Sequence, residues 1–184
     1  MAEFGLTVVD YYRREEIQVA NAVPTAEGAI QRAMEATDTT IHGSRCLVLG
    51  FGRTGKLLAD RLKGMGAQVT VAARKYGDLA WIEALGFTSL AVKDLPGRLE
   101  AFDLIFNTVP ALLLDASRLA ETKAGCLLLE LAAAPGGVDS RAAKALGRRL
   151  IRAPGLPGAV APRTAAAAIR ESIRHILEER GEPM

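Results

Sequence analysis

Short apolar runs alternate with glycine turns and amphipathic stretches along most of the chain, from Ser44 onward. Runs of leucine and β-branched residues bounded by such turns predict buried strands. We expect strands over residues 45–49, 68–73, 87–90, 103–107, 127–131 and 150–153. Because helical patterns separate these runs, they predict a doubly wound parallel sheet with helices on both faces, which is an α/β fold.

Helices are expected where apolar side chains recur every three or four positions. They fall at residues 54–65, 79–85 and 140–146, and in a last helix that begins near Pro162 and ends at Gly181. Before the sheet, Pro24 suits a helix start, because its missing N–H is no loss there. We therefore expect a connecting helix over residues 25–36, with Val23 extended in front of the proline. The apolar run at residues 6–12 is compatible with a strand or a short helix.

The composition argues against several classes of protein. Among 184 residues, 23 basic and 21 acidic side chains leave a formal charge of +2, so neither nucleic acid nor an anionic membrane is an expected partner. No apolar run approaches the ~18 residues of a membrane span, and the first residues lack the features of a signal peptide. Cys46 and Cys126 have apolar neighbours and are expected to be buried thiols without a bridge. These features favour a protein of the cytoplasm.

A glycine-rich G-x-G-x-x-G pattern follows the first predicted strand and opens the next helix. In a Rossmann fold the first glycine permits a tight turn, the second lets backbone approach a pyrophosphate, and the third lets the helix pack on the strand. The free N–H groups of the helix start then attract the phosphates. The alternative is a purely structural turn. The predicted pyrophosphate contacts are Gly50, Phe51, Gly52, Arg53, Thr54 and Gly55.

The second predicted strand ends in Ala73, Arg74 and Lys75, where sites for NAD place an acid that binds the ribose 2′-hydroxyl. No acid follows until Asp78. A guanidinium can bind a 2′-phosphate through two parallel hydrogen bonds, and a lysine adds positive charge. The pattern therefore favours NADP over NAD, against the alternative of a solvated basic pair that merely ends the strand.

Three further loops are expected at the carboxyl edge of the sheet, where ligands of doubly wound folds bind. Each is rich in proline and small residues, which give rigid backbone that a flat ring can approach, although each could also simply turn the chain. The predicted contacts around the nicotinamide ribose are Asn107, Thr108, Val109, Pro110, Leu131 and Ala132.

Candidates for acid–base chemistry are few. His42 precedes the first strand, away from the ligand edge, and His175 lies on the polar side of the last helix. The sequence has no cluster with metal-ligand spacing, so no metal is expected. The pattern identifies no catalytic acid or base. The weaker candidates for substrate contact are Asn21, Thr25, Glu27 and Arg163.

Six stretches together carry a resemblance to a known family. They lie at residues 21–28, 40–43, 48–55, 107–110, 134–139 and 154–162. This combination, spread over nearly the whole chain, resembles the family of A-type subunits of dipicolinate synthase, whereas the glycine loop alone points to the wider group of 2-hydroxyacid dehydrogenases.

The resemblance implies an NADP-dependent oxidoreductase. Members of the family form dipicolinate from a dihydrodipicolinate-level dicarboxylate, on the branch of the lysine pathway that serves sporulation. The flavoprotein-like B-type subunit of dipicolinate synthase is the implied partner. The glycine loop and Arg74 match the family at the positions already assigned to the cofactor.

The resemblance also implies a division of the chain. Residues 1–42 would be a remnant of a substrate domain plus the helix that crosses to the cofactor domain, residues 43–161 the Rossmann dinucleotide-binding domain, and residues 162–184 a C-terminal helix packed on it. We expect most of the substrate domain, about a hundred residues in the family, to be missing. An apolar patch around Val8, Val9, Tyr11 and Tyr12 would then be exposed and could pair two copies.

Two alternative functions stay open. Another enzyme of the 2-hydroxyacid dehydrogenase type is one, although the expected carboxyl-edge loops contain no histidine. A non-catalytic NADP-binding module that regulates or assembles with a partner protein is the other.

Overall fold

Six parallel strands form one sheet in the order β3-β2-β1-β4-β5-β6. The computed structural model describes residues 8–181, so predictions made for residues 1–7 and 182–184 lie outside the described residues. The predicted α/β fold with a doubly wound parallel sheet is confirmed, and each predicted strand is present with its ends shifted by no more than one residue. The strands are β1 (Arg45–Leu49), β2 (Gln68–Ala73), β3 (Thr88–Ala91), β4 (Leu104–Asn107), β5 (Leu127–Glu130) and β6 (Arg149–Arg152).

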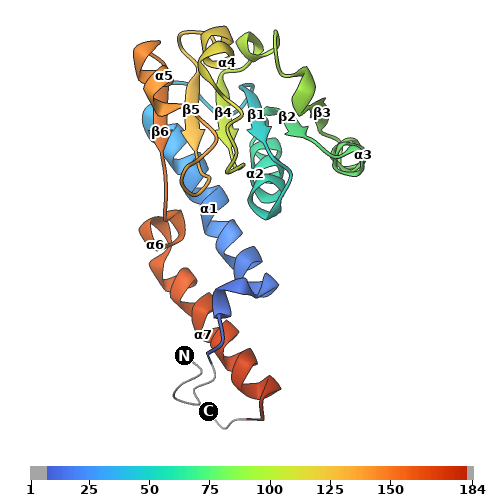
Figure 1. The fold of residues 1–184 in the computed structure, drawn as a ribbon, viewed down its shortest axis with the longest axis vertical. Coiled ribbons are helices and arrows are strands. Elements are labelled where there is room, and N and C mark those ends of the chain that lie inside the picture. Colours follow the sequence, from blue (N-terminus) through green and yellow to red (C-terminus); the bar gives the residue numbers. More distant parts are fainter. Residues whose placement is uncertain (1–7, 182–184) are drawn as a thin grey trace.

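Helices cover both faces of this sheet (Figure 1). One face carries α1 (Glu15–Ala36), α2 (Arg53–Gly64) and α3 (Tyr76–Ala84), and the other carries η3 (Val92–Asp94), η4 (Leu99–Ala101), α4 (Ala116–Glu121) and α5 (Ser140–Ala145). Side chains alternate along β1, so Cys46 and Val48 enter the first core while Leu47 and Leu49 enter the second. All four are fully buried, which explains why the strand has a continuous apolar sequence.

The connecting helix is longer than predicted. α1 begins at Glu15 and contains Pro24 in its interior, so the prediction that Pro24 starts this helix, with Val23 extended, is wrong. A proline removes one hydrogen bond from a helix interior. Pro24 is nevertheless buried, and α1 packs against α2, α6 and α7. Tertiary packing along the whole helix therefore outweighs the local preference.

Part of the molecule projects beyond the carboxyl ends of the strands (Figure 1). There, η2 (Tyr11–Arg13) and the first half of α1 lie beside α6 (Leu156–Val160) and α7 (Pro162–Glu179). We call this assembly the arm, and the sheet with α2 to α5 the body. The predicted start of α7 at Pro162 is confirmed, and the helix ends at Glu179.

Two short helices, α4 and α6, were not predicted. Asp115 caps α4, because its carboxylate accepts a hydrogen bond of 2.9 Å from the Arg118 N–H. This N-cap is a signal that the sequence contains. α6 starts after Gly155, whose φ of +67° lies in the left-handed region, within a loop that looked like a plain proline-glycine turn.

Cys46 and Cys126 are buried free thiols, as predicted. Burial raises the pKa of each thiol to about 12. None of the described helices is long and apolar enough to cross a membrane. Within residues 8–181, no group of three or more histidine, cysteine, aspartate and glutamate side chains is arranged to hold a metal ion.

Candidate functional site

A cavity of about 520 Å³ lies at the carboxyl ends of β1, β2 and β4. Such a concave site at this edge of a parallel sheet is the expected ligand position for the fold. Twelve of the predicted cofactor contacts line it, together with six residues that were not predicted. The lining residues are Gln18, Gly50, Phe51, Gly52, Arg53, Thr54, Gly55, Ala72, Ala73, Arg74, Lys75, Asp78, Val92, Thr108, Val109, Pro110, Ala111 and Leu113.

The glycines of the loop have different surroundings. Gly50 has a φ of +103°, and a Cβ there would lie 2.4 Å from the Thr108 hydroxyl. A Cβ on Gly55 would lie 2.1 Å from the carbonyl oxygen of Gly50, so the helix could not pack this closely. A Cβ on Gly52 would meet nothing within 4 Å. Gly50 and Gly55 are thus required by packing, whereas Gly52 faces open space that a ligand can use.

The start of α2 fits a pyrophosphate. Gly52 is its N-cap and supplies no side-chain hydrogen bond, so the N–H groups of the first turn are available to an anion. The neighbouring Phe51 side chain is only 7% exposed and packs in the core, so its contribution to a ligand would come from its backbone.

Arg53 of this loop is bound by the arm. Its Nε lies 2.8 Å and 2.9 Å from the two carboxylate oxygens of Glu15, the first residue of α1. Hydrogen bonding from Arg53 lowers the pKa of Glu15 below its ordinary value. Because the two side chains are 47% and 66% exposed, the pair is accessible to solvent and can exchange partners.

The end of the cavity beside β2 carries three charged side chains. Arg74 and Lys75 follow the strand and are exposed, and Asp78 lies in the first turn of α3. In the sequence Asp78 is only a late acid after the second strand, yet the first turn of α3 brings it to the same cavity. Gln18 was missed because α1 was expected to start ten residues or so further along.

The opposite end of the cavity is formed by the loop after β4. The Thr108 hydroxyl donates a hydrogen bond of 2.8 Å to the Leu49 carbonyl, which fixes this loop to β1. Asn107 is fully buried and does not line the cavity; its amide donates to the Val109 carbonyl at 2.9 Å and so shapes the loop from behind. The predicted contacts Leu131 and Ala132 also lie outside the lining.

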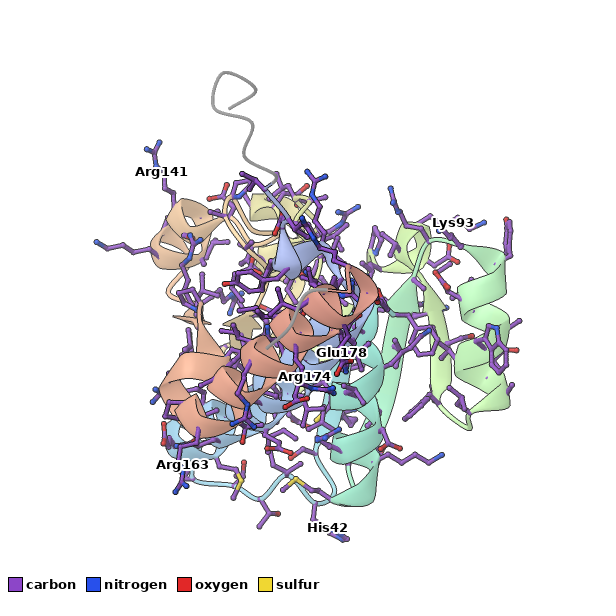
Figure 2. All side chains as sticks on the ribbon, turned by 90° about the horizontal axis from the view of Figure 1, so that it is seen from below. His42, Lys93, Arg141, Arg163, Arg174 and Glu178 are labelled. Carbon is purple, nitrogen blue, oxygen red and sulfur yellow. The ribbon has the colours of Figure 1, made fainter. Side chains whose placement is uncertain are left out.

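The four weaker candidates for substrate contact are not brought to this cavity. Asn21 and Thr25 are bonded to each other along α1, through the Thr25 hydroxyl and the Asn21 carbonyl at 2.6 Å. Glu27 lies 3.5 Å from Arg61 of α2. Arg163 is exposed at the start of α7 and points outward from the arm (Figure 2).

Neither histidine lies at the cavity. His42 is exposed at the other end of the sheet, next to Gly66. His175 lies in the arm, with its Nδ1 3.8 Å from Glu16. Among the lining residues Asp78 and Lys75, both at the end of the cavity beside β2, are therefore the side chains with the ordinary chemistry of a general acid or base.

Comparison with known proteins gives consistent results. Residues 9–156 match the family model described as D-isomer specific 2-hydroxyacid dehydrogenase, NAD binding domain. The chain is 38% identical over 172 residues to the A-type subunit of dipicolinate synthase from Bacillus subtilis, covering 94% of this chain and 58% of that protein. A D-3-phosphoglycerate dehydrogenase of Mycobacterium tuberculosis is 32% identical over 70% of this chain and 25% of its own length.

Solved structures agree with these matches. The crystal structure of the A-type dipicolinate synthase subunit from Bacillus halodurans superposes with a TM-score of 0.92 at 38% identity, covering 96% of this chain and 61% of that one. The corresponding structure from Bacillus subtilis gives 0.93 at 37% identity, covering 97% and 60%. The chain thus spans roughly three fifths of the length of these relatives.

Proposed function

Because the chain belongs to the family of D-isomer specific 2-hydroxyacid dehydrogenase NAD binding domains, we propose that it binds NADP and is the cofactor domain of an oxidoreductase like the A-type subunit of dipicolinate synthase. One observation carries the cofactor assignment. The glycine loop and the basic pair Arg74 and Lys75 line the same cavity. A dinucleotide whose pyrophosphate lies on the loop would place its adenosine ribose at the end of β2, beside this pair.

Asp78 makes the choice between NADP and NAD testable. Its carboxylate would repel a 2′-phosphate but could bind a free 2′-hydroxyl, whereas Arg74 can bind the phosphate through two hydrogen bonds. Two positive charges against one negative charge favour the phosphate. The domain boundaries at residues 42 and 161 belong to the same proposal.

In the proposed reaction, hydride passes between the ring of a dihydrodipicolinate-type dicarboxylate and C4 of the nicotinamide. The cofactor supplies the hydride chemistry when it is bound. The residues of this chain bind and orient it: the start of α2 and Gly52 hold the pyrophosphate, and Thr108, Val109 and Pro110 flank the nicotinamide ribose. By the same resemblance, the reaction would serve sporulation in the cytoplasm, together with the B-type subunit of dipicolinate synthase.

A second candidate function is cofactor binding without turnover by this chain alone. The cavity lining favours it, because Asp78 lies at the adenosine end and no acid or base lines the end at Thr108. The two candidates differ in one result. A catalytic domain oxidises the dicarboxylate once the B-type subunit and a substrate domain are supplied, whereas a binding module does not.

Calorimetric titration with NADPH and with NADH tests the cofactor assignment. NADPH should bind more tightly, and Arg74→Ala should weaken NADPH binding by about tenfold to a hundredfold while leaving NADH nearly unchanged. The control is Asp78→Asn, which should leave NADH binding unchanged and strengthen NADPH binding. An equal loss of both cofactors in Arg74→Ala, or a selective loss of NADH in Asp78→Asn, would assign the site to NAD instead.

A further inference from the structure

Glu130, the last residue of β5, is a buried carboxylate that accepts hydrogen bonds on both oxygens. It is 3% exposed. Its Oε1 accepts from the Asn107 side-chain amide at 2.8 Å and from the Ala132 N–H at 3.0 Å. Its Oε2 accepts from the N–H groups of Gly137 and Val138 at 2.7 Å and 2.9 Å. All four acceptor positions of the carboxylate are therefore taken by donors, which is the pattern of an ionised group.

The negative charge of Glu130 is held by neutral donors, and the cation paired with it in the sheet register, Arg152 of β6, donates to the Ser140 hydroxyl at 3.2 Å instead. The four donors are neutral amides, and no lysine or arginine forms an ion pair with Glu130 in the part of the chain that the structure describes. Neutral N–H groups stabilise a buried carboxylate but do not cancel its charge. A charge in this position is screened weakly, because water and salt do not surround it.

This charge lies directly behind the end of the cavity formed by the loop after β4. The register of the sheet pairs Glu130 with Asn107 of β4. The Asn107 amide binds Glu130 on one side and the carbonyl of Val109 on the other, and Val109 lines the cavity. The Asn107 amide nitrogen lies 2.8 Å from the carboxylate and 2.9 Å from the Val109 carbonyl oxygen, so one amide group separates the charge from the cavity wall.

We propose that the buried Glu130 carboxylate makes this end of the cavity select the oxidised form of the nicotinamide cofactor over the reduced form. The inference rests on the proposed function, which places the nicotinamide here. The oxidised ring carries a positive charge, and the reduced ring is neutral because it has gained a hydride, that is, two electrons and one proton. The phosphates and riboses are the same in both forms, so a fixed negative charge near the ring acts on the difference between them.

The proposed effect concerns loading and release. A site that holds the oxidised cofactor more tightly fills with the hydride acceptor and discharges the reduced product, which suits a domain that removes hydride from its substrate. The same preference works against hydride transfer while the cofactor is bound, because it stabilises the oxidised ring. Glu130 is thus a specificity-determining residue that acts through charge, and it touches neither substrate nor cofactor.

Glu130 also has an obvious structural role, which the experiment must separate from this one. Its carboxylate ties the loop after β4 to the loop after β5, and a Cβ on Gly136 would lie 2.8 Å from its Oε2. Loss of this support would deform the cavity for both forms of the cofactor. A change in the ratio of the dissociation constants for the oxidised and reduced cofactor therefore measures the effect of the Glu130 charge. An equal change in both constants measures the effect of a deformed cavity.

The test measures dissociation constants of NADP⁺ and NADPH for the wild-type chain, Glu130→Gln and Glu130→Asp, with thermal unfolding as a check on folding. Glu130→Gln should reduce the preference for NADP⁺ by about tenfold. Glu130→Asp retains the charge and should keep the wild-type ratio even if both forms bind more weakly. Asp78→Asn is the matched control, because it removes a carboxylate at the adenosine end and should change both affinities equally. An unchanged ratio in Glu130→Gln would overturn the inference.

If Glu130→Gln does not fold, the dissociation constants of the wild-type chain provide the test. NADP⁺ should then bind more tightly than NADPH, and equal binding or a preference for NADPH would overturn the inference. Failure of the proposed function gives a different result, in which no oxidised or reduced nicotinamide dinucleotide binds. Absence of binding would contradict both the proposed function and the inference about Glu130. Binding of both forms with a ratio that does not change in Glu130→Gln would contradict the inference alone.

Discussion

The body is stabilised mainly by buried apolar side chains, whereas the arm is stabilised largely by exposed ion pairs. Every residue of β4 is buried, and Phe106 in its middle is completely inaccessible to solvent. In α7, by contrast, Ser172 and Ile176 are the buried residues, while the side chains around them form ion pairs. Arg14 donates two hydrogen bonds of 2.7 Å to the carboxylate of Glu179 and so joins α1 to the end of α7.

The difference indicates which kinds of change should affect the body and which should affect the arm. Apolar burial depends little on salt or pH, whereas exposed ion pairs are screened by salt and lost when a partner is neutralised. The cavity lies where the two regions meet, because Gln18 of the arm lines it with the glycine loop of the body. Changes in the apolar core of the body should therefore act on stability, and changes among the ion pairs of the arm on local order and ligand affinity.

The largest expected effect is a core truncation in the body. Phe106→Ala should lower the free energy of unfolding by about 3–5 kcal/mol, because it empties a fully buried site. Ile173→Ala in the arm should change it by less than about 0.5 kcal/mol, since this side chain is 42% exposed. Urea unfolding measures both. A comparable loss in the two variants would show that the arm has an apolar core of its own.

A smaller effect is expected from the third glycine of the loop. Gly55→Ala should destabilise the body by about 1–3 kcal/mol, because the new Cβ would lie 2.1 Å from the Gly50 carbonyl oxygen. Gly52→Ala has the same chemistry but open space around it, so thermal unfolding should be nearly unchanged while cofactor binding weakens. If Gly52→Ala unfolds at the same lowered temperature as Gly55→Ala, the assignment of Gly52 to the ligand is wrong.

Acid should loosen the arm before the body. Hydrogen bonding from Arg14 lowers the pKa of Glu179 below its ordinary value of 4.5. Its ion pair therefore contributes fully above that value and is lost as the pH falls through the lower pKa of the folded state. Amide hydrogen exchange should then accelerate in α7 while β4 stays protected.

Glu179→Gln is the control for this prediction. It should give the faster exchange of α7 already at neutral pH and remove most of its pH dependence. Molar salt should act in the same direction as acid in the wild-type chain. Simultaneous loss of protection in α7 and β4 would mean that the arm unfolds together with the body.

The body was more predictable from sequence than the arm or the site. Strands such as β1 are buried on both faces beyond their first residue, so Cys46 to Leu49 form an uninterrupted apolar run that marks the strand in the sequence. The glycine loop was found because its spacing meets a backbone requirement at Gly50 and Gly55. The start of α1 was missed because packing against α6 and α7, which is not a local property, overrides Pro24.

The residues of the site that were missed depend on tertiary structure in the same way. Asp78 comes to the cavity by a helix turn, and Gln18 by a helix that was predicted too short. Glu130 interrupts an apolar run inside the predicted strand 127–131, and no neighbouring residue in the sequence marks its partners. Its role depends on N–H groups of the loop after β5 and on the side-chain amide of Asn107 in β4, which converge on it in the folded chain.

The smallest expected effect concerns the contact between arm and loop. A pyrophosphate on the glycine loop would compete with Glu15 for the Arg53 guanidinium, since both are anions and the pair is solvent-accessible. Glu15→Gln should therefore strengthen binding of NADP⁺ and NADPH alike by about two- to fivefold at low salt, as expected for an exposed ion pair, and less at high salt. Glu16→Gln is the matched control. It removes the same charge from the next residue of α1, but the Glu16 side chain binds Arg14 and not Arg53. Weaker binding in Glu15→Gln would show that Glu15 holds Arg53 in place for the phosphates, in which case the arm supports the site of the body and does not compete with its ligand.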